Sequence, residues 1–148
     1  MATITHWTAQ PQAIVPTAAS GVSVTPNASA WVNSAWTQIT AGISNPISIA
    51  DLVATGPASG GPAAAAWIEF ELGTGTAPSE VAIGVFKLAF ETRAGEDGVY
   101  WSHIPLEVAA NVAVSVRMRK EDTSTGAWTF KMLYYERPGG FVAQRHRS

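Results

Sequence analysis

Two carboxylates spaced two residues apart, Glu69 and Glu71, are the first side chains in this 148-residue chain whose pattern could do chemistry. On a strand such residues point to the same face, and glycoside hydrolases use two carboxylates about 5 to 10 Å apart. Further acids stand at Glu80, Glu91 and Glu107. The pair alternates with large apolar residues, however, which is typical of a strand with one solvated face. We therefore expect surface charges here rather than a catalytic site.

Histidine is the other residue type that could support catalysis or hold a metal. His6, His103 and His146 are spread over both ends and the middle of the chain, so a shared site would require both ends to fold onto one point. The chain has no cysteine, which excludes disulfides and thiolate metal sites. We expect no catalytic residue, no metal site and no cofactor.

Common catalytic and phosphate-binding motifs are missing from the sequence, which contains no G-x-S-x-G, no H-E-x-x-H and no P-loop. ELGTGTAPSE, residues 71–80, does contain a G-x-G. Because this motif joins two expected strands and opens no helix, it lacks the helix N-terminus that binds phosphate. It predicts a hairpin loop.

Cations gather in VAVSVRMRKEDTSTGAWTFKMLYYE, residues 112–136, which has the pattern of two alternating strands joined by a polar turn, a β-hairpin. Arg117, Arg119 and Lys131 fall in the phase opposite to the valines and Trp128. We expect these cations on the solvated face, paired with glutamates of neighbouring strands. Contact with an acidic partner is the alternative role.

The elements that would position these side chains are almost all strands, because apolar and polar residues alternate along most of the chain. In AWIEFEL, residues 66–72, the residues Ile68, Phe70 and Leu72 share one face. Eight segments fit strands, at 22–25, 31–40, 47–54, 66–72, 80–92, 99–108, 112–118 and 128–134. Strands at this spacing predict an all-β chain with a single β-sandwich or jelly-roll-like domain.

Two irregularities are expected within these strands. In residues 80–92 the apolar phase slips by one residue between Val85 and Phe86, beside Gly84, which indicates a bulge or a bend. Pro105 cannot donate a ladder hydrogen bond, so the segment 99–108 fits the edge of a sheet or a bend.

Length and charge bound the architecture and the class of partner. A chain of this length is typical of one domain, and we place the β-sandwich body at residues 21–136, an extended N-terminal arm at 1–20 and a basic tail at 137–148. No stretch approaches the roughly 18 apolar residues of a membrane span, so we expect a soluble protein that binds no membrane. A net charge of −2 argues against general or specific binding of nucleic acid.

Residues 1–50 contain no Asp, Glu, Lys or Arg, yet they include Trp7, Trp31 and Trp36. Exposed surfaces normally mix both signs of charge, so part of this region is expected to be covered, unless its Ser, Thr, Asn and Gln supply the polarity. Two prolines favour an extended path for the arm, which then cannot bury its own apolar side chains. Deleting residues 1–16 is therefore expected to weaken association while leaving the stability of the body nearly unchanged.

Four segments resemble, in this order, a group of small phage-encoded proteins that look like virion components of tailed bacteriophages. They are SGVSVTPNASAWVNSAWTQIT, FELGTGTAPSEVAI, IPLEV and VAVSVRMRKEDTSTGAWTFKMLYY. The resemblance spans roughly residues 20–136 and consists of turn and strand patterns. It implies a β-sandwich that is assembled onto the virion in the host cytoplasm, either as a head decoration (cement) protein or in the tail or its fibres. It carries over no catalytic residue.

The partner implied by this resemblance is the major capsid protein or another virion protein, with the chain acting as a homo-oligomer, a trimer being favoured. The candidate partner-binding residues are Trp7, Ile14, Val15, Arg117, Arg119 and Phe141. A competing hypothesis is a carbohydrate-binding module, because aromatic residues such as Trp67, Trp101 and Tyr135 could stack on sugar rings.

Overall fold

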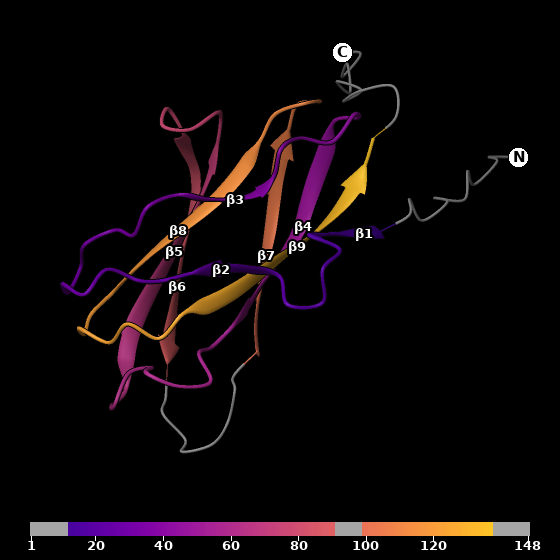
Figure 1. Ribbon diagram of the computed structural model, residues 1–148. Coiled ribbons are helices and arrows are strands. Elements are labelled where there is room, and N and C mark those ends of the chain that lie inside the picture. Colours follow the sequence, from indigo (N-terminus) through magenta and orange to yellow (C-terminus); the bar gives the residue numbers. More distant parts are fainter. Residues whose placement is uncertain (1–11, 91–98, 138–148) are drawn as a thin grey trace, which may run out of the picture.

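The computed structural model describes residues 12–90 and 99–137. Within these residues the chain forms nine strands (Figure 1), and it contains no helix long and apolar enough to cross a membrane. The strands are β1 (Gln12–Val15), β2 (Val22–Val24), β3 (Thr37–Thr40), β4 (Ile47–Thr55), β5 (Ala66–Thr74), β6 (Val81–Phe90), β7 (Val99–Val108), β8 (Val114–Lys120) and β9 (Trp128–Glu136). The prediction of an all-β chain is confirmed.

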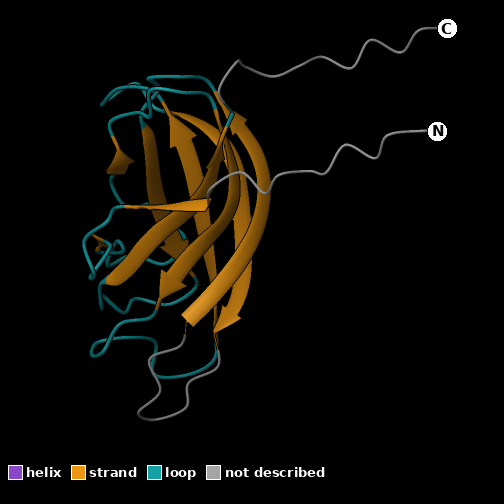
Figure 2. Ribbon diagram, turned by 90° about the vertical axis from the view of Figure 1, so that its right-hand side faces the viewer, coloured by secondary structure: helices purple, strands orange, loops and turns teal. Residues whose placement is uncertain are grey.

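The strands form two antiparallel sheets, named sheet A and sheet B here. Sheet A has the order β1-β9-β4-β7, and β2 also pairs with β9. Because β4 occupies the other side of β9, the short strands β1 and β2 follow one another along the same edge. Sheet B has the order β3-β8-β5-β6. In Figure 2 the described residues are strands, loops and turns, which agrees with the predicted β-sandwich.

The core lies where the apolar faces of the two sheets meet. In sheet B the residues Ile68, Phe70 and Leu72 of β5 are buried, as the alternation of residues 66–72 predicts. The ring of Phe70 lies 5.5 Å from the ring of Trp128 and 5.0 Å from that of Phe130, both of which belong to β9 in sheet A. Tilted and edge-to-face contacts of this kind are favoured geometries for aromatic pairs. The aromatic cluster therefore joins the two sheets.

The prediction that residues 112–136 form a hairpin is wrong. Strand β8 pairs with β3 and β5 in sheet B, whereas β9 pairs with β1, β2 and β4 in sheet A. The seven residues 121–127 that connect the two strands cross from one sheet to the other. Sheets pack about 10 Å apart, which such a connection spans easily. The predicted apolar faces do meet, but across the core rather than within one ladder.

Three local features agree with the sequence patterns. Strands β5 and β6 form a hairpin around the loop at residues 75–80. The register of this pair shifts by one residue at Ile83, which places an irregularity beside Gly84 as expected, but before the glycine and not between Val85 and Phe86, where the ladder is continuous. Strand β7, which contains Pro105, is an edge strand of sheet A.

The N-terminal third differs more from the expectation. Residues 12–15 fall in the predicted arm, but they form β1, whose partners are Met132–Tyr135 of β9, and both Ala13 and Val15 pack against the core. A run of four residues is too short to be recognised as a strand from its pattern alone, because its pairing depends on β9. Of the segment 31–40, only the last four residues pair as β3.

Candidate binding sites on the two outer faces

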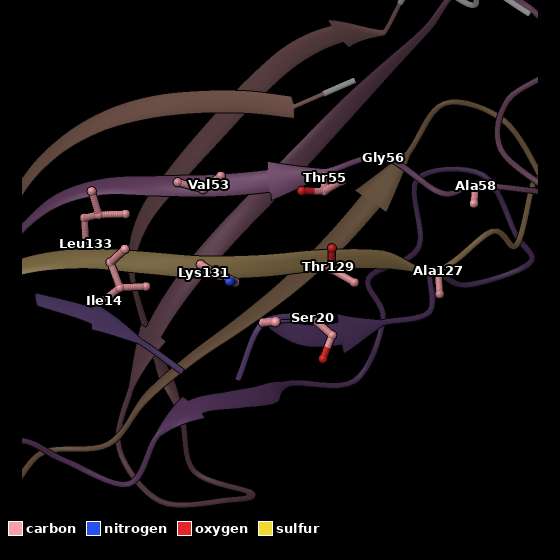
Figure 3. Close-up of a pocket in the computed structure, with 11 residues that line it drawn as sticks. Ile14, Ser20, Val53, Thr55, Gly56, Ala58, Ala127, Thr129, Lys131 and Leu133 are labelled. Carbon is pink, nitrogen blue, oxygen red and sulfur yellow. The ribbon is translucent and has the colours of Figure 1, made fainter. Parts of the chain in front are cut away.

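The outer face of sheet A carries a groove of about 660 Å³. Its floor consists of outward-facing residues of two neighbouring strands, Thr129, Lys131 and Leu133 of β9 and Val53 and Thr55 of β4. Figure 3 shows Lys131 between Leu133 and Thr129, with the β4 residues alongside. Most of this surface is apolar, so the groove could bury an apolar segment or ligand.

One wall of this groove is formed where the chain leaves the edge of β9. Strand β1 pairs as far as Met132 and β2 begins opposite Phe130, so the connection between them loops out beside Lys131. Ala19 and Ser20 of this loop line the groove (Figure 3 labels Ser20), and Ile14 of β1, 45% exposed, lines it as well. The loop returns to β9 through Gly21, whose φ of 72° favours glycine.

Lys131 is the one cation among the described residues that has neither an ion pair nor a side-chain hydrogen bond. The other described cations have them: Lys87 and Arg119 with Glu69, Arg117 with Glu71, Lys120 with Asp122, and Arg137 with Ser48. An unpaired ammonium inside an apolar groove favours a ligand that brings one negative group and apolar flanks.

The outer face of sheet B is different, because its cations are paired. Arg117 of β8 donates to Glu71 of β5, and Arg119 Nε donates to Glu69 Oε1 at 2.8 Å. Lys87 Nζ of β6 lies 3.2 Å from Glu69 Oε2. The prediction that Arg117, Arg119 and Lys131 pair with glutamates of neighbouring strands is therefore right for the two arginines and wrong for Lys131, because the neighbours of Lys131 on sheet A are apolar or uncharged. Glu69, Glu71 and their cationic partners are called the ion-pair ladder here.

Two tryptophans of the uncharged N-terminal region lie over the same ladder. The Arg117 guanidinium is 4.2 Å from the ring centre of Trp36, and that of Arg119 is 5.9 Å from the ring centre of Trp31. These distances are within the range of cation–π attraction. The ring of Trp36 also fills the space above Gly73, where a Cβ added to the glycine would approach it to 2.6 Å. The tryptophans therefore cover part of the charged face.

A second, smaller cleft of about 320 Å³ opens on this face. It is lined by Trp31, Trp67, Glu69 and Lys87, which come from the segment before β3 and from strands β5 and β6. Both tryptophans are largely exposed, while Glu69 is only 6% exposed. The cleft therefore combines two apolar ring faces with a buried carboxylate.

The candidate partner-binding residues fall in different places. Ile14 lines the groove of sheet A, Val15 packs against the core, and Arg117 and Arg119 belong to the ladder of sheet B. Trp7 and Phe141 lie outside the described residues. The six residues therefore do not form one surface.

The aromatic residues of the carbohydrate hypothesis are also separated. Trp67 is on the outer face of sheet B, whereas Tyr135 is on β9 in sheet A, and the side chain of Trp101 lies outside the described part. Trp31, which completes the cleft with Trp67, was not among the predicted site residues. The signal available in the sequence was the presence of a tryptophan in a segment without charged residues.

Of the remaining acids and histidines, the structure describes the side chains of only some. Glu107 is exposed on β7 and Glu80 is half-buried before β6, while His6, His146 and Glu91 lie outside the described residues, as does the side chain of His103. Among the residues that are described, no group of three or more His, Asp or Glu could hold a metal ion.

A buried ion pair lies at the C-terminal end of β8. Lys120 is almost fully buried, and its Nζ lies 3.0 Å from Asp122 Oδ1 and donates to the Asp122 carbonyl oxygen at 2.7 Å. Partial burial by itself raises the pKa of Asp122, but the hydrogen bonds from Lys120 and Ser124 outweigh it, and the pKa lies below its ordinary value of 3.8. On β9, burial and the charge of Glu136 raise the pKa of Tyr134.

No model of a known protein family and no curated protein matches the sequence. A solved structure that does match is that of infectious bursal disease virus, Gx strain, with 11% sequence identity and a TM-score of 0.39. The match covers 89% of this chain and 31% of the viral chain. So low a TM-score assigns the chain to no family, and its function is argued from the two outer faces.

Proposed function

We propose that this chain is a non-enzymatic structural component of a virion, in the first place a capsid decoration (cement) protein and alternatively a tail or fibre component. Its partner is the major capsid protein or another virion protein. The proposal rests on the resemblance of residues 20–136 to small virion proteins of tailed bacteriophages and on the groove of sheet A. A groove of this kind can bury a segment of a neighbouring subunit.

The observation that carries the proposal is the unpaired Lys131 in the apolar groove. We assign the groove to an extended segment of a neighbouring virion subunit that brings one carboxylate between apolar side chains. The carboxylate pairs with Lys131, while its apolar neighbours cover Leu133 and Ile14. Burying apolar area contributes about 25 cal/mol per Å², and repeated copies on a lattice add avidity to a modest single contact.

The test uses particles of the virus that encodes the chain, stripped of this protein and then rebound with purified variants. Lys131→Gln removes the charge and keeps most of the side-chain length, so binding should weaken at least tenfold. Lys131→Arg keeps the charge and should bind within a few fold of the parent. Because Lys131 faces outward, both variants should unfold at nearly the parent's temperature.

The result that would overturn the groove assignment is parent-like rebinding by Lys131→Gln. An equal loss in Lys131→Gln and Lys131→Arg would also contradict it, because the charge would then not be the feature recognised. Binding of the parent to tail structures but not to heads would replace decoration by the tail or fibre role.

A further inference from the structure

The cleft on the outer face of sheet B presents two exposed aromatic rings. Trp31 is 45% exposed and Trp67 is 51% exposed, and both line the same 320 Å³ space. This volume is at the lower end of the roughly 300–1,000 Å³ of small-molecule sites. An exposed indole has a flat apolar face and retains an N–H donor at its edge.

The backbone fixes Trp31 in a conformation that bulky residues rarely adopt. Its φ is +57°, in the left-handed region, and its backbone N–H donates to the Lys120 carbonyl oxygen at 2.7 Å. The Arg119 guanidinium is 5.9 Å from the ring centre. Such strain costs free energy and is concentrated at ligand-binding positions. The ring is thereby pre-organised at the mouth of the cleft.

The base of the cleft contains a buried acceptor that is not fully used. Glu69 Oε1 receives the hydrogen bond from Arg119, but Oε2 is buried and has no hydrogen-bond donor. Lys87 Nζ lies 3.2 Å from Oε2 as an ion pair without hydrogen-bond geometry, and its side chain is 63% exposed. Buried acceptors usually have a donor. Because Oε2 is itself closed to solvent, a ligand hydroxyl can donate to it once the exposed Lys87 side chain moves aside.

The local charge narrows the class of ligand. Two aromatic rings and a carboxylate would suit an organic cation, but Glu69 is already shared by Arg119 and Lys87, so the three groups together carry a positive charge. A cation is therefore disfavoured. A ligand that fits has a flat C–H face for the indoles, a hydroxyl for Glu69 Oε2, and oxygens that accept from Lys87.

We propose that this cleft binds a pyranose ring of a glycan, stacked on Trp31 and Trp67 with one hydroxyl donating to Glu69. The proposal is independent of the groove on sheet A. We assign it to binding and not to hydrolysis, because Glu69 is the one carboxylate among the described residues that lines the cleft, and hydrolysis uses two. Glu71 pairs with Arg117 instead.

The test screens the purified chain against an array of neutral and uronic-acid-containing oligosaccharides, followed by calorimetric titration with those that bind. Trp67→Ala and Trp31→Ala should each weaken binding at least tenfold. Val85→Ala is the matched control, because Val85 is an exposed apolar residue on the same face that does not line the cleft. It should bind like the parent.

Two further outcomes keep the proposal falsifiable. If Trp31→Ala fails to fold, the exposed Trp67 still provides the test. Absence of binding to every oligosaccharide, equal binding by Trp67→Ala and the parent, or selective binding of a quaternary ammonium probe such as choline would each overturn it. Neutral and acidic sugars are tested separately. Preferential binding of uronic acids would indicate that the carboxylate of the sugar pairs with Lys87.

Discussion

Single residues at the end of β8 illustrate how local charge and burial act together. Lys120 continues the inward phase of β8 after Met118, so a cation lies in a position that the alternation assigns to the core. A buried ammonium is tolerated only when it is paired, and Asp122 provides both a carboxylate and a carbonyl oxygen. This pair anchors the start of the crossing from sheet B to sheet A.

Asp122→Asn should lower the free energy of unfolding at neutral pH by about 1 to 3 kcal/mol, because it leaves the buried ammonium with a weaker partner. The folded-state pKa of Asp122 is lowered, so its contribution is complete above 3.8 and is lost as pH falls through the lower folded value. The difference between parent and variant should therefore shrink below pH 3.8. Urea titrations at successive pH values measure this, and a difference that stays constant with pH would contradict it.

Two glycines with nearly the same backbone conformation allow a matched prediction. Gly21 has φ 72° and Gly60 has φ 69°, but a Cβ at Gly21 would lie 2.6 Å from the Phe130 carbonyl oxygen, whereas one at Gly60 would meet nothing closer than 3.5 Å. Both alanine variants carry the left-handed strain of about 1 to 2 kcal/mol. Gly21→Ala should cost more, because the clash also disturbs the pairing of β2 with β9. Equal losses in thermal unfolding would show that the loop moves freely away from β9.

At the scale of elements, the edge of β9 decides how the N-terminal region is attached. Strands β1 and β2 share this edge, and the loop between them forms a wall of the groove around Lys131. The four residues of β1 carry no distinctive pattern, so sequence alone assigned them to an arm. Strand β5, which has a long alternation, was predicted nearly to its ends, because one buried face fixes its phase.

Two truncations separate the arm from the strand. A deletion of residues 1–11 keeps β1, whereas a deletion of residues 1–16 removes it together with the packing of Ala13 and Val15. We expect the longer deletion to lower the melting temperature several degrees below that of the shorter one, since it takes apolar side chains from the core. This replaces the expectation that deleting residues 1–16 leaves the body unaffected. Equal melting temperatures in calorimetry would mean that β1 adds no stability.

At the scale of the whole molecule, the sandwich separates two surfaces of different chemistry. Sheet A presents an apolar groove with one unpaired cation, and sheet B presents paired charges with exposed tryptophans. The sequence correctly predicted that the side chains of Lys131, Arg117 and Arg119 lie on the outer faces of their strands. It did not predict that β8 and β9 belong to different sheets, because alternation identifies the buried face but not the partner strand. The sequence also did not identify Trp31 as a site residue, because its position depends on its contacts with Arg119 and Lys120 of β8.

Cryo-electron microscopy of gradient-purified virions, combined with mass spectrometry of their proteins, would show whether the chain is a structural component of the particle. If it is, we expect repeated copies of this β-sandwich on the particle, on the head for a decoration protein, with a segment of a neighbouring subunit lying in the groove and a carboxylate beside Lys131. Virions produced together with this chain but lacking it would rule out a structural role.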